Sequence, residues 1–494
     1  MTYNMKILYS ILFFMIAARI FGMFTLPLTD TTEARYAHTA LIMATSGDWI
    51  TPYYDLGIPF WGKPPFSFWL QALSVNLFGI NDFSSRFPSL LFTLLTMGLI
   101  YTYFKKFHSK ESGLWAILIY FSFLLTYALC GAVLTDPYLA FATTLSMLSF
   151  VMVLKKQENY WGYLFFVGLA IGMLAKGPLA IVLVGGAMFL WILPDFKTRI
   201  MKLGALPWLS GVLLFLLISI PWYIIAELKT PGFLEYFIVG EHYKRFVDPG
   251  WAGDLYGVAH KKPYGTIWLM WVMATIPWGF VVIASLYKKI SLKGNIFTKL
   301  KEDSVGSYFV AWSLFAMIFF TVSGNVLWTY ILPALPSLAI LIAIALEKNS
   351  FSIKIFSKNI HYALLLFTPI LLLIANIYII VKPDSIKSDK FLIQYFQSVK
   401  QKEKQLYYIY HRPFSAQYYS FDKSILVASK EKIKRKSNSI DYAAFKRKIE
   451  TLSANPYVVI RNREIYSFKN RFNYKLVQKF KNKEKTLFKL IIAE

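Results

Sequence analysis

Four polar segments interrupt an apolar chain, and each one carries charged side chains suited to reactions of phosphorylated substrates. Several cations beside carboxylates can hold a phosphate and stabilise the negative charge that develops as it leaves. A carboxylate can also take a proton from an acceptor hydroxyl or bind a divalent metal. The candidate residues are Asp30, Glu33, Arg35 and Lys63 in the first segment, Asp136 in the second, Lys176 in the third, and Glu241, His242, Arg245 and His260 in the fourth. We therefore predict one site, assembled from separate segments, for chemistry in which a phosphate or pyrophosphate leaves.

Each candidate also has a structural explanation, which the sequence leaves open. Glu33 and Arg35 could cap and pair a helix at the membrane interface. Asp136 precedes a proline and fits the N-cap of a helix, where aspartate is favoured. Lys176 precedes Gly-Pro and could extend its amine from a helix end to water. The two histidines of the fourth segment lack metal-ligand spacing, so a structural role is their default.

The elements that must position these residues are membrane-spanning helices. Of the 494 residues, 56% are hydrophobic and 16% are charged, against about 25% charged in soluble domains. Apolar runs of the ~20 residues needed to cross a bilayer recur over the first 380 positions. The first run, 7–28, is too long for the apolar region of a signal peptide and lacks a small-residue cleavage site. The single cysteine, Cys130, excludes an intrachain disulfide. We predict an all-α polytopic membrane protein.

The apolar runs predict about eleven transmembrane helices within a membrane domain at 1–381, whose catalytic outer loops are 29–84, 131–137 and 227–263. Two further segments, Thr32–Thr45 and Pro65–Phe78, are expected to lie at the interface. The fifth and sixth helices could instead form one re-entrant pair. The predicted helices are 6–28, 85–104, 112–130, 137–154, 160–175, 179–193, 204–226, 264–286, 307–322, 328–346 and 361–380.

The distribution of lysine and arginine predicts the orientation. The short loops on the side of the N-terminus are all basic, near 105–110, 155–156, 197–202, 288–301 and 348–358, whereas the opposite loops are acidic. The positive-inside rule therefore places the N-terminus in the cytoplasm and the candidate site outside. This distribution also accounts for the net charge of +26 without a nucleic-acid partner. No nucleotide is available outside, and the sequence has no Gly-rich phosphate loop, so a lipid-phosphate donor is favoured.

The last segment, 382–494, predicts a small α/β domain outside the membrane. Strand-like runs at 406–411, 457–460, 464–468 and 486–492 alternate with helical patterns at 415–419 and 442–452. Its many lysines predict a solvated face, and contact with anionic lipid headgroups is the alternative.

The polar segments resemble a known family. TTEARYAHT, SGDW, GKPP, FG and RFPS near the N-terminus are followed by LTDPYL, MLAKGP, IPWYI, GEHYKRF, PW and TYILPALP in consistent order. Together these motifs resemble the bacterial membrane glycosyltransferases that transfer 4-amino-4-deoxy-L-arabinose to lipid A. Those enzymes are relatives of the dolichyl-phosphate-mannose–protein mannosyltransferase superfamily. The resemblance covers most of positions 1–345.

The resemblance implies a C-type membrane glycosyltransferase fold. Such an enzyme takes a sugar from a polyprenyl-phosphate carrier, here undecaprenyl phosphate, and transfers it with inversion outside the bacterial inner membrane. The implied donor-phosphate ligands are Arg35 and Lys63, with Lys176 and Arg245 as further candidates. The implied catalytic acids are Asp30, Glu33 and Asp136, and the implied pocket residues are Tyr36, Glu241, His242 and Tyr330.

The chain departs from the aminoarabinose transferases at three places. It has Gly62 where they carry an acid before Lys-Pro, Thr32 where they have an aspartate, and SGNVLW where relatives often have a lysine. If the missing acid helps to hold a metal, the metal site is in doubt here, so a divalent cofactor stays open. These departures weaken the case for aminoarabinose as the sugar more than they weaken the case for a glycosyltransferase.

The predicted function is an inverting glycosyltransferase that modifies lipid A or another envelope glycan on the periplasmic side of the inner membrane. A protein O-glycosyltransferase with the same donor is the close alternative. A transporter or flippase of lipid-linked sugars should instead carry its polar residues near mid-membrane within internal repeats, and the sequence shows neither. The sugar could be aminoarabinose, galactosamine, mannose, glucose or galactose, because several helices shape the pocket.

Overall fold

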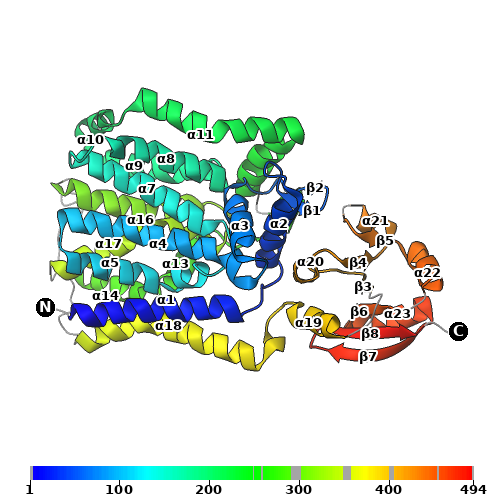
Figure 1. The fold of residues 1–494 in the computed structure, drawn as a ribbon. Helices are drawn as coiled ribbons and strands as arrows, with labels where there is room; N and C mark the ends of the chain where they lie inside the picture. The colour runs from blue at the N-terminus through cyan, green and yellow to red at the C-terminus, as the bar shows by residue number, and fades with distance from the viewer. Residues whose placement is uncertain are drawn as a thin grey trace. The chain divides into compact units, whose positions relative to one another are not determined.

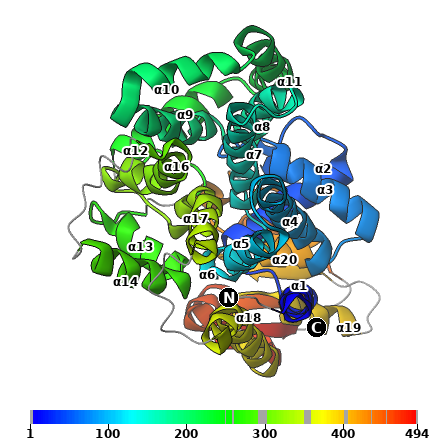
Figure 2. The ribbon, with the colours of Figure 1, turned by 90° about the vertical axis from the view of Figure 1, so that its left-hand side faces the viewer.

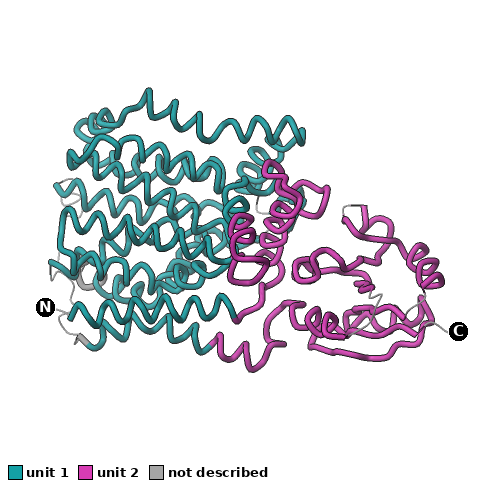
Figure 3. Tube along the Cα trace, viewed as in Figure 1, with its two compact units in different colours: residues 1–24, 61–70, 86–374 teal, residues 25–60, 71–85, 375–494 magenta. Residues whose placement is uncertain are grey.

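The structure, a computed structural model, describes residues 4–248, 250–257, 260–290, 302–348, 358–399, 405–434, 436–452 and 455–491. The chain forms two compact units, shown in Figure 3. Unit 1 comprises Met1–Phe24, Trp61–Leu70 and Arg86–Ile374, and unit 2 comprises Thr25–Phe60, Gln71–Ser85 and Ala375–Glu494. Parts of the basic loops predicted at 288–301 and 348–358 lie outside the described residues.

Unit 1 is a bundle of helices that run side by side (Figure 1). The helices wholly or mainly in this unit are α1 (Met5–Thr25), α4 (Asp82–Phe107), α5 (Lys110–Ser122), α6 (Leu124–Leu129), α7 (Asp136–Leu154), α8 (Tyr160–Lys176), α9 (Leu179–Ile192), α10 (Phe196–Lys202), α11 (Trp208–Lys229), α12 (Arg245–Val247), α13 (Thr266–Ala274), α14 (Trp278–Ile290), α16 (Ser304–Thr321), α17 (Leu335–Glu347) and α18 (Lys358–Val381). A π-helix, η3 (Glu235–Lys244), and a 3-10 helix, η4 (Trp328–Ala334), complete the unit.

Helices α7 and α8 pack side by side in the bundle, as the end-on view of Figure 2 shows. Ser146 Oγ of α7 donates a hydrogen bond to the Phe165 carbonyl of α8 at 2.9 Å. A Cβ atom on Gly168 would lie only 2.4 Å from Ser146 Oγ, so glycine permits this approach. Small residues let helices pack closely where lipid provides no hydrophobic drive for association. This pair also fixes the distance between the first residue of α7 and the last residue of α8.

The predicted polytopic helical architecture is confirmed, and the chain is a multi-pass membrane protein. Among the described residues, eight helices are long and apolar enough to cross a membrane, or nine if the pair α13 and α14, bent by 116°, is one span. The predicted helices at 112–130 and 160–175 correspond to the broken pair α5 and α6 and to the 17-residue α8. The count of eleven therefore stays a prediction.

Unit 2 contains a six-stranded mixed sheet, as predicted for the C-terminal segment. The strand order is β5 (Ser439–Ile440), β4 (Ser424–Val427), β3 (Leu406–Ile409), β6 (Tyr457–Arg461), β8 (Lys485–Ile491) and β7 (Lys475–Lys481). The first four strands are parallel, and β8 and β7 are antiparallel to their neighbours. Its helices are α19 (Lys390–Ser398), α20 (Phe414–Tyr419), α21 (Lys430–Ile433), α22 (Tyr442–Glu450) and α23 (Ile465–Phe472).

The strand predicted at 464–468 is wrong, because this segment begins α23. Its alternating pattern imitates a strand over five residues, but Phe468 and Phe472 recur at helical spacing and are both buried. Helix α19 and strands β4, β5 and β7 were not predicted. The sheet buries both faces: Tyr407 and Ile409 pack in one core cluster, whereas Leu406 and Tyr408 pack in the other.

Most of the first outer loop belongs to the same compact unit as the C-terminal sheet, whereas Trp61–Leu70 belongs to unit 1. It contains α2 (Thr32–Ser46), the hairpin of β1 (Tyr53–Asp55) and β2 (Ile58–Pro59), and most of α3 (Phe66–Phe78). Helix α2 packs on α20. His38 Nε2 lies 2.8 Å from Asp422 Oδ2, and Arg412 Nη2 lies 3.4 Å from the buried Asp55 Oδ2. The two compact units therefore do not coincide with the two domains predicted to meet at residue 381, because most of the first outer loop groups with the C-terminal segment.

Candidate active site

Glu241 is the centre of a charge network in unit 1. Its carboxylate lies 3.4 Å from Lys63 Nζ and 3.0 Å from Arg245 Nη1, and it accepts a hydrogen bond from Tyr236 OH at 3.1 Å. Arg245 also lies 3.4 Å from Asp254 Oδ2. Glu241 lies on η3, and Arg245 begins α12 directly after it. A π-helix of ten residues is rare, and π-helical turns occur frequently at functional sites.

The charges of this network stabilise one another inside a largely water-excluded site. Burial works to raise the pKa of Glu241, but Lys63 and Arg245 outweigh it and hold the pKa below its usual value. Burial works to lower the pKa of Arg245, and Glu241 and Asp254 reverse the shift. The network therefore orients two cations, Lys63 and Arg245, around one carboxylate.

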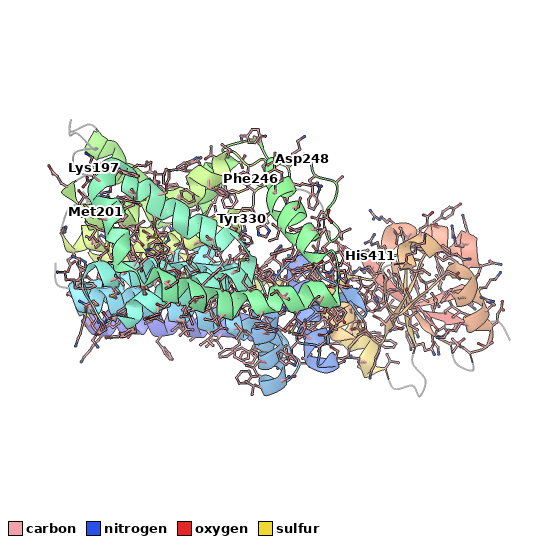
Figure 4. The ribbon with its side chains drawn as sticks, turned by 90° about the horizontal axis from the view of Figure 1, so that it is seen from above. Lys197, Met201, Phe246, Asp248, Tyr330 and His411 are labelled. Atoms are coloured by element: carbon pink, nitrogen blue, oxygen red, sulfur yellow. The ribbon has the colours of Figure 1, made fainter. Side chains whose placement is uncertain are left out.

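A second ion pair joins the start of α7 to the end of α8. Lys176 Nζ lies 2.6 Å from Asp136 Oδ1, and both side chains are buried. Lys176 Nζ also lies 5.0 Å from the centroid of the Tyr330 ring, at cation–π distance. Tyr330 acts electrostatically on Arg245 as well, so the two ion-pair groups are neighbours. Figure 4 labels Tyr330 among the helices of unit 1.

The structural explanations for this second pair are wrong. Lys176 does not extend to water, because it is buried against the carboxylate. Thr135 occupies the N-cap position of α7, and Asp136 is the first helical residue, so its side chain is available to pair. The lysine is followed by Gly177 at φ +75°, where a Cβ atom would lie 2.7 Å from the Phe237 ring. Only glycine can turn the chain there and admit η3 beside the lysine.

His242 ties η3 to the end of α8. Its Nδ1 lies 2.8 Å from the Phe237 carbonyl oxygen, and its Nε2 lies 3.1 Å from the Lys176 carbonyl oxygen. Burial lowers the pKa of His242, and the two carbonyl oxygens oppose that shift. Both ring nitrogens face backbone acceptors, so the histidine serves the structural role that was its default. In the same outer loop, the backbone N–H of His260 donates a hydrogen bond to Asn325 Oδ1 at 3.2 Å.

The remaining predicted residues lie in unit 2. Asp30 Oδ1 accepts a hydrogen bond from the Ser415 backbone N–H at 3.0 Å, and Oδ2 accepts one from the Ser415 hydroxyl. Burial raises the pKa of Asp30 to about 6, against the opposing effect of these hydrogen bonds. Both carboxylate oxygens are thus engaged by α20, the helix that packs on α2.

Glu33, Arg35 and Tyr36 lie on α2. Glu33 Oε2 accepts a hydrogen bond from the Thr29 N–H at 2.9 Å, which fits the predicted capping alternative. Arg35 Cζ lies 5.4 Å from the Tyr36 ring centroid and 5.5 Å from that of Phe60. The guanidinium is therefore held above the two aromatic rings.

Sequence reasoning missed Tyr236 and Asp254 of the network in unit 1 and His38 of α2. Tyr236 and Asp254 lie in the predicted catalytic loop 227–263, so their place near Arg245 was the available signal. No sequence signal pointed to His38, because its partner Asp422 is 384 positions away. Within the part of the chain that the structure describes, no group of three or more His, Cys, Asp or Glu side chains is arranged to hold a metal.

Comparisons with known proteins identify relatives of the chain. Residues 7–237 match the family model for dolichyl-phosphate-mannose-protein mannosyltransferase. The chain is 31% identical over 326 residues to the undecaprenyl phosphate-alpha-4-amino-4-deoxy-L-arabinose arabinosyl transferase of Aeromonas hydrophila, an alignment covering 64% of this chain and 56% of the relative. The enzyme of the same name from Wigglesworthia glossinidia brevipalpis is 30% identical over 328 residues, covering 65% and 55%. The chain thus spans little more than half the length of these relatives.

The fold has a solved counterpart. The crystal structure of ArnT from Cupriavidus metallidurans bound to undecaprenyl phosphate superposes with a TM-score of 0.76 at 15% identity, covering 98% of both chains. The apo structure of the same protein matches equally well. The predicted C-type fold is therefore confirmed. The match of residues 7–237 to the mannosyltransferase family model agrees with the predicted resemblance to this superfamily.

Proposed function

We propose that this protein is an inverting glycosyltransferase that moves a sugar from an undecaprenyl-phosphate carrier to lipid A or another envelope glycan. The observation that carries the proposal is the clustering of Lys63, Lys176 and Arg245 in one unit, each paired with a buried carboxylate. The acids offset the cost of burying these cations while the site is empty. These three positively charged side chains are then oriented to bind the phosphate of the lipid carrier.

The bond that breaks joins the anomeric carbon to the carrier phosphate. Cations at that phosphate stabilise the charge of the leaving group more strongly in a water-excluded site than in water. Undecaprenyl phosphate is released, and the acceptor oxygen bonds to the opposite face of the sugar carbon. An acceptor phosphate is already ionised and needs little base catalysis, whereas a hydroxyl needs a carboxylate to take its proton.

Among the predicted acids, Asp136 suits this role better than Asp30. Both oxygens of Asp30 accept hydrogen bonds from Ser415. Among the contacts of the described residues, one oxygen of Asp136 is held, by Lys176. That lysine holds the carboxylate beside the phosphate-binding cations. Asp30 is better explained as a support for α2.

The comparisons support undecaprenyl phosphate as the carrier. The curated relatives are named for transfer of aminoarabinose from undecaprenyl phosphate, and the ArnT crystal structure contains that lipid. Aminoarabinose is thus the first sugar to test, although Thr32 and Gly62 depart from the pattern of those enzymes. A divalent metal remains an open proposal.

The proposed topology places the N-terminus in the cytoplasm and the C-terminal domain in the periplasm of a bacterial inner membrane. Its support is the charge bias of the loops. Within unit 1, Lys197 and Met201 of the basic α10 lie near one end of the helices, and Tyr330 lies farther along them (Figure 4). The candidate site is thus separated from a basic loop along the bundle.

The decisive test combines donor binding with product analysis. Undecaprenyl phosphate should stabilise the purified protein against heat, and Lys63→Met should remove that stabilisation. Lys244→Met is the matched control, because Lys244 is exposed on the same η3 that carries Glu241. Lipid A from cells with the wild-type protein should gain the mass of one sugar, and the Lys63→Met strain should lose it.

The outcomes separate the alternatives. Unchanged lipid A with a sugar on another envelope glycan retains the glycosyltransferase and changes its acceptor. A sugar on protein identifies the O-glycosyltransferase alternative. Absence of any lipid-induced stabilisation in the wild-type protein would overturn the proposed donor.

A further inference from the structure

Helix α1 carries one arginine, Arg19, which is buried in unit 1 outside the charge networks described above. Arg19 is 7% exposed, and its Nη2 donates a hydrogen bond to the Ala128 carbonyl oxygen at 2.6 Å. Its Cζ lies 5.9 Å from the centroid of the Tyr127 ring, and Tyr127 OH donates to the Met15 carbonyl oxygen of α1 at 2.8 Å. A charged side chain within a membrane-spanning helix is costly, so Arg19 is a candidate for a functional role.

Arg19 stabilises the C-terminal end of α6. Ala128 is among the last four residues of that helix, whose carbonyl groups lack partners within the helix and carry its partial negative charge. Gly131 follows this end, and a Cβ atom there would lie 2.3 Å from Arg19 Nε and 2.6 Å from Cζ. Its backbone is not left-handed. The guanidinium itself therefore excludes a side chain at Gly131.

The opposite end of α6 is held as well. The Leu124 N–H donates a hydrogen bond to the Ile276 carbonyl oxygen at 2.9 Å, and Trp278 Nε1 donates one to Ser122 Oγ at 2.8 Å. A helix of six residues is too short to be stable by itself, so its ends must be held by other segments. Arg19 is the contact from α1 that fixes the C-terminal end.

The end of α6 that Arg19 holds leads directly to the candidate site. The turn 130–135 joins it to Asp136, the first residue of α7, whose carboxylate lies 2.6 Å from Lys176 Nζ. Helix α6 also packs on η4, which carries Tyr330, and the centroid of that ring lies 5.0 Å from Lys176 Nζ. Two groups that contact the lysine therefore lie on segments that α6 supports.

We propose that Arg19 is a positioning residue for glycosyl transfer: by holding the end of α6, it fixes the start of α7 and keeps Asp136 against Lys176. The inference rests on the proposed function, in which this ion pair takes part in the chemistry. Arg199 of α10 is a matched control within unit 1, because it is also buried and its Nη1 donates to the Trp191 carbonyl oxygen at 2.6 Å. Helix α10 lies at the basic end of the bundle, away from Tyr330 (Figure 4).

The first test measures the ion pair without turnover. The coupling free energy between Asp136 and Lys176 is obtained from Asp136→Asn, Lys176→Met and the double variant by reversible unfolding in mixed micelles. The same cycle is then repeated in two backgrounds. Arg19→Met should remove most of the coupling, because the start of α7 is no longer fixed, whereas Arg199→Met should lower overall stability and leave the coupling intact.

A glycine variant displaces the guanidinium while leaving the arginine in the chain. Gly131→Ala should weaken the same coupling, and adding it to Arg19→Met should cause little further loss, because the two changes break one contact. Gly185→Ala is the control, since a Cβ atom at Gly185 would meet no atom within 4 Å. Additive losses from Gly131→Ala and Arg19→Met would show that the two residues act separately and would overturn the proposed contact.

Kinetics then distinguish positioning from folding. Arg19→Met should lower kcat about tenfold or more and leave the KM for the lipid donor unchanged, because Lys63 and Arg245 stay in place. Arg19→Lys, which keeps a cation near the end of α6, should recover part of the loss, and Arg199→Met should keep the wild-type kcat. Unchanged coupling in Arg19→Met, or equal losses of kcat in Arg19→Met and Arg199→Met, would overturn the proposal. Loss of coupling in Arg19→Met together with no transfer by the wild type would refute the proposed function and retain the positioning of the ion pair.

Discussion

The ion pair between Asp136 and Lys176 permits a quantitative test of how the site is built. The two charged atoms are 2.6 Å apart, and the side chains are only 8% and 9% exposed. Removing one partner of such a pair leaves an uncompensated buried charge, which costs about 3–5 kcal/mol. Asp136→Asn and Lys176→Met should each lower the free energy of unfolding by that amount. The double variant buries neither charge, so we expect it to lose less than about 2 kcal/mol.

The assay is reversible unfolding in mixed micelles, with transfer activity measured on the same preparations. Lys155→Met is the control, because Lys155 is exposed at the end of α7. All three variants of the pair should lose transfer, since the proposed mechanism uses both charges, whereas the control should match the wild type. Additive losses of about 6–10 kcal/mol in the double variant would refute a direct buried pair. Transfer activity retained in the double variant would refute its part in the chemistry.

Three further predictions concern other charged side chains. Burial raises the pKa of Asp30 from 3.8 to about 6, so ionising this carboxyl lowers the free energy of unfolding as the pH rises through that window. Asp30→Asn should abolish this pH-dependent loss, which amounts to as much as about 3 kcal/mol. Parallel pH profiles of unfolding for the variant and the wild type would contradict this prediction. The lowered pKa of Glu241 predicts the opposite sign: the advantage of wild type over Glu241→Gln should be complete above the ordinary pKa and disappear as the pH falls through the lowered value. Arg412→Met leaves Asp55 buried without its cation, so unit 2 should lose about 3–5 kcal/mol and be cut faster in limited proteolysis, whereas the exposed Arg447→Met should be cut at the wild-type rate.

Much of the membrane unit could be predicted from the sequence, because a bilayer demands long apolar helices whatever their partners. Runs such as 7–28 and 361–380 reappear as α1 and α18. Predictions weakened where a helix is short or broken, as at α5 and α6, since burial in the bundle permits irregular segments that lipid would not. In the C-terminal domain, the five residues 464–468 fit the pattern of a strand and of a helix equally well. The structure shows a helix there, in which Phe468 and Phe472 are buried on the same face.

The sequence by itself determined which residues are candidates for the chemistry and where they lie along the chain. Lys63, Asp136, Lys176 and Arg245 were identifiable because charges are costly beside apolar runs. Only the tertiary structure decided their partners: Lys176 pairs with a residue 40 positions away, and Lys63 contacts Glu241 across 178 positions. It also assigned Asp30 to Ser415, 385 positions away. Ion pairs act over a few ångströms, and sequence separation carries no information about such distances until the helices and the sheet have packed.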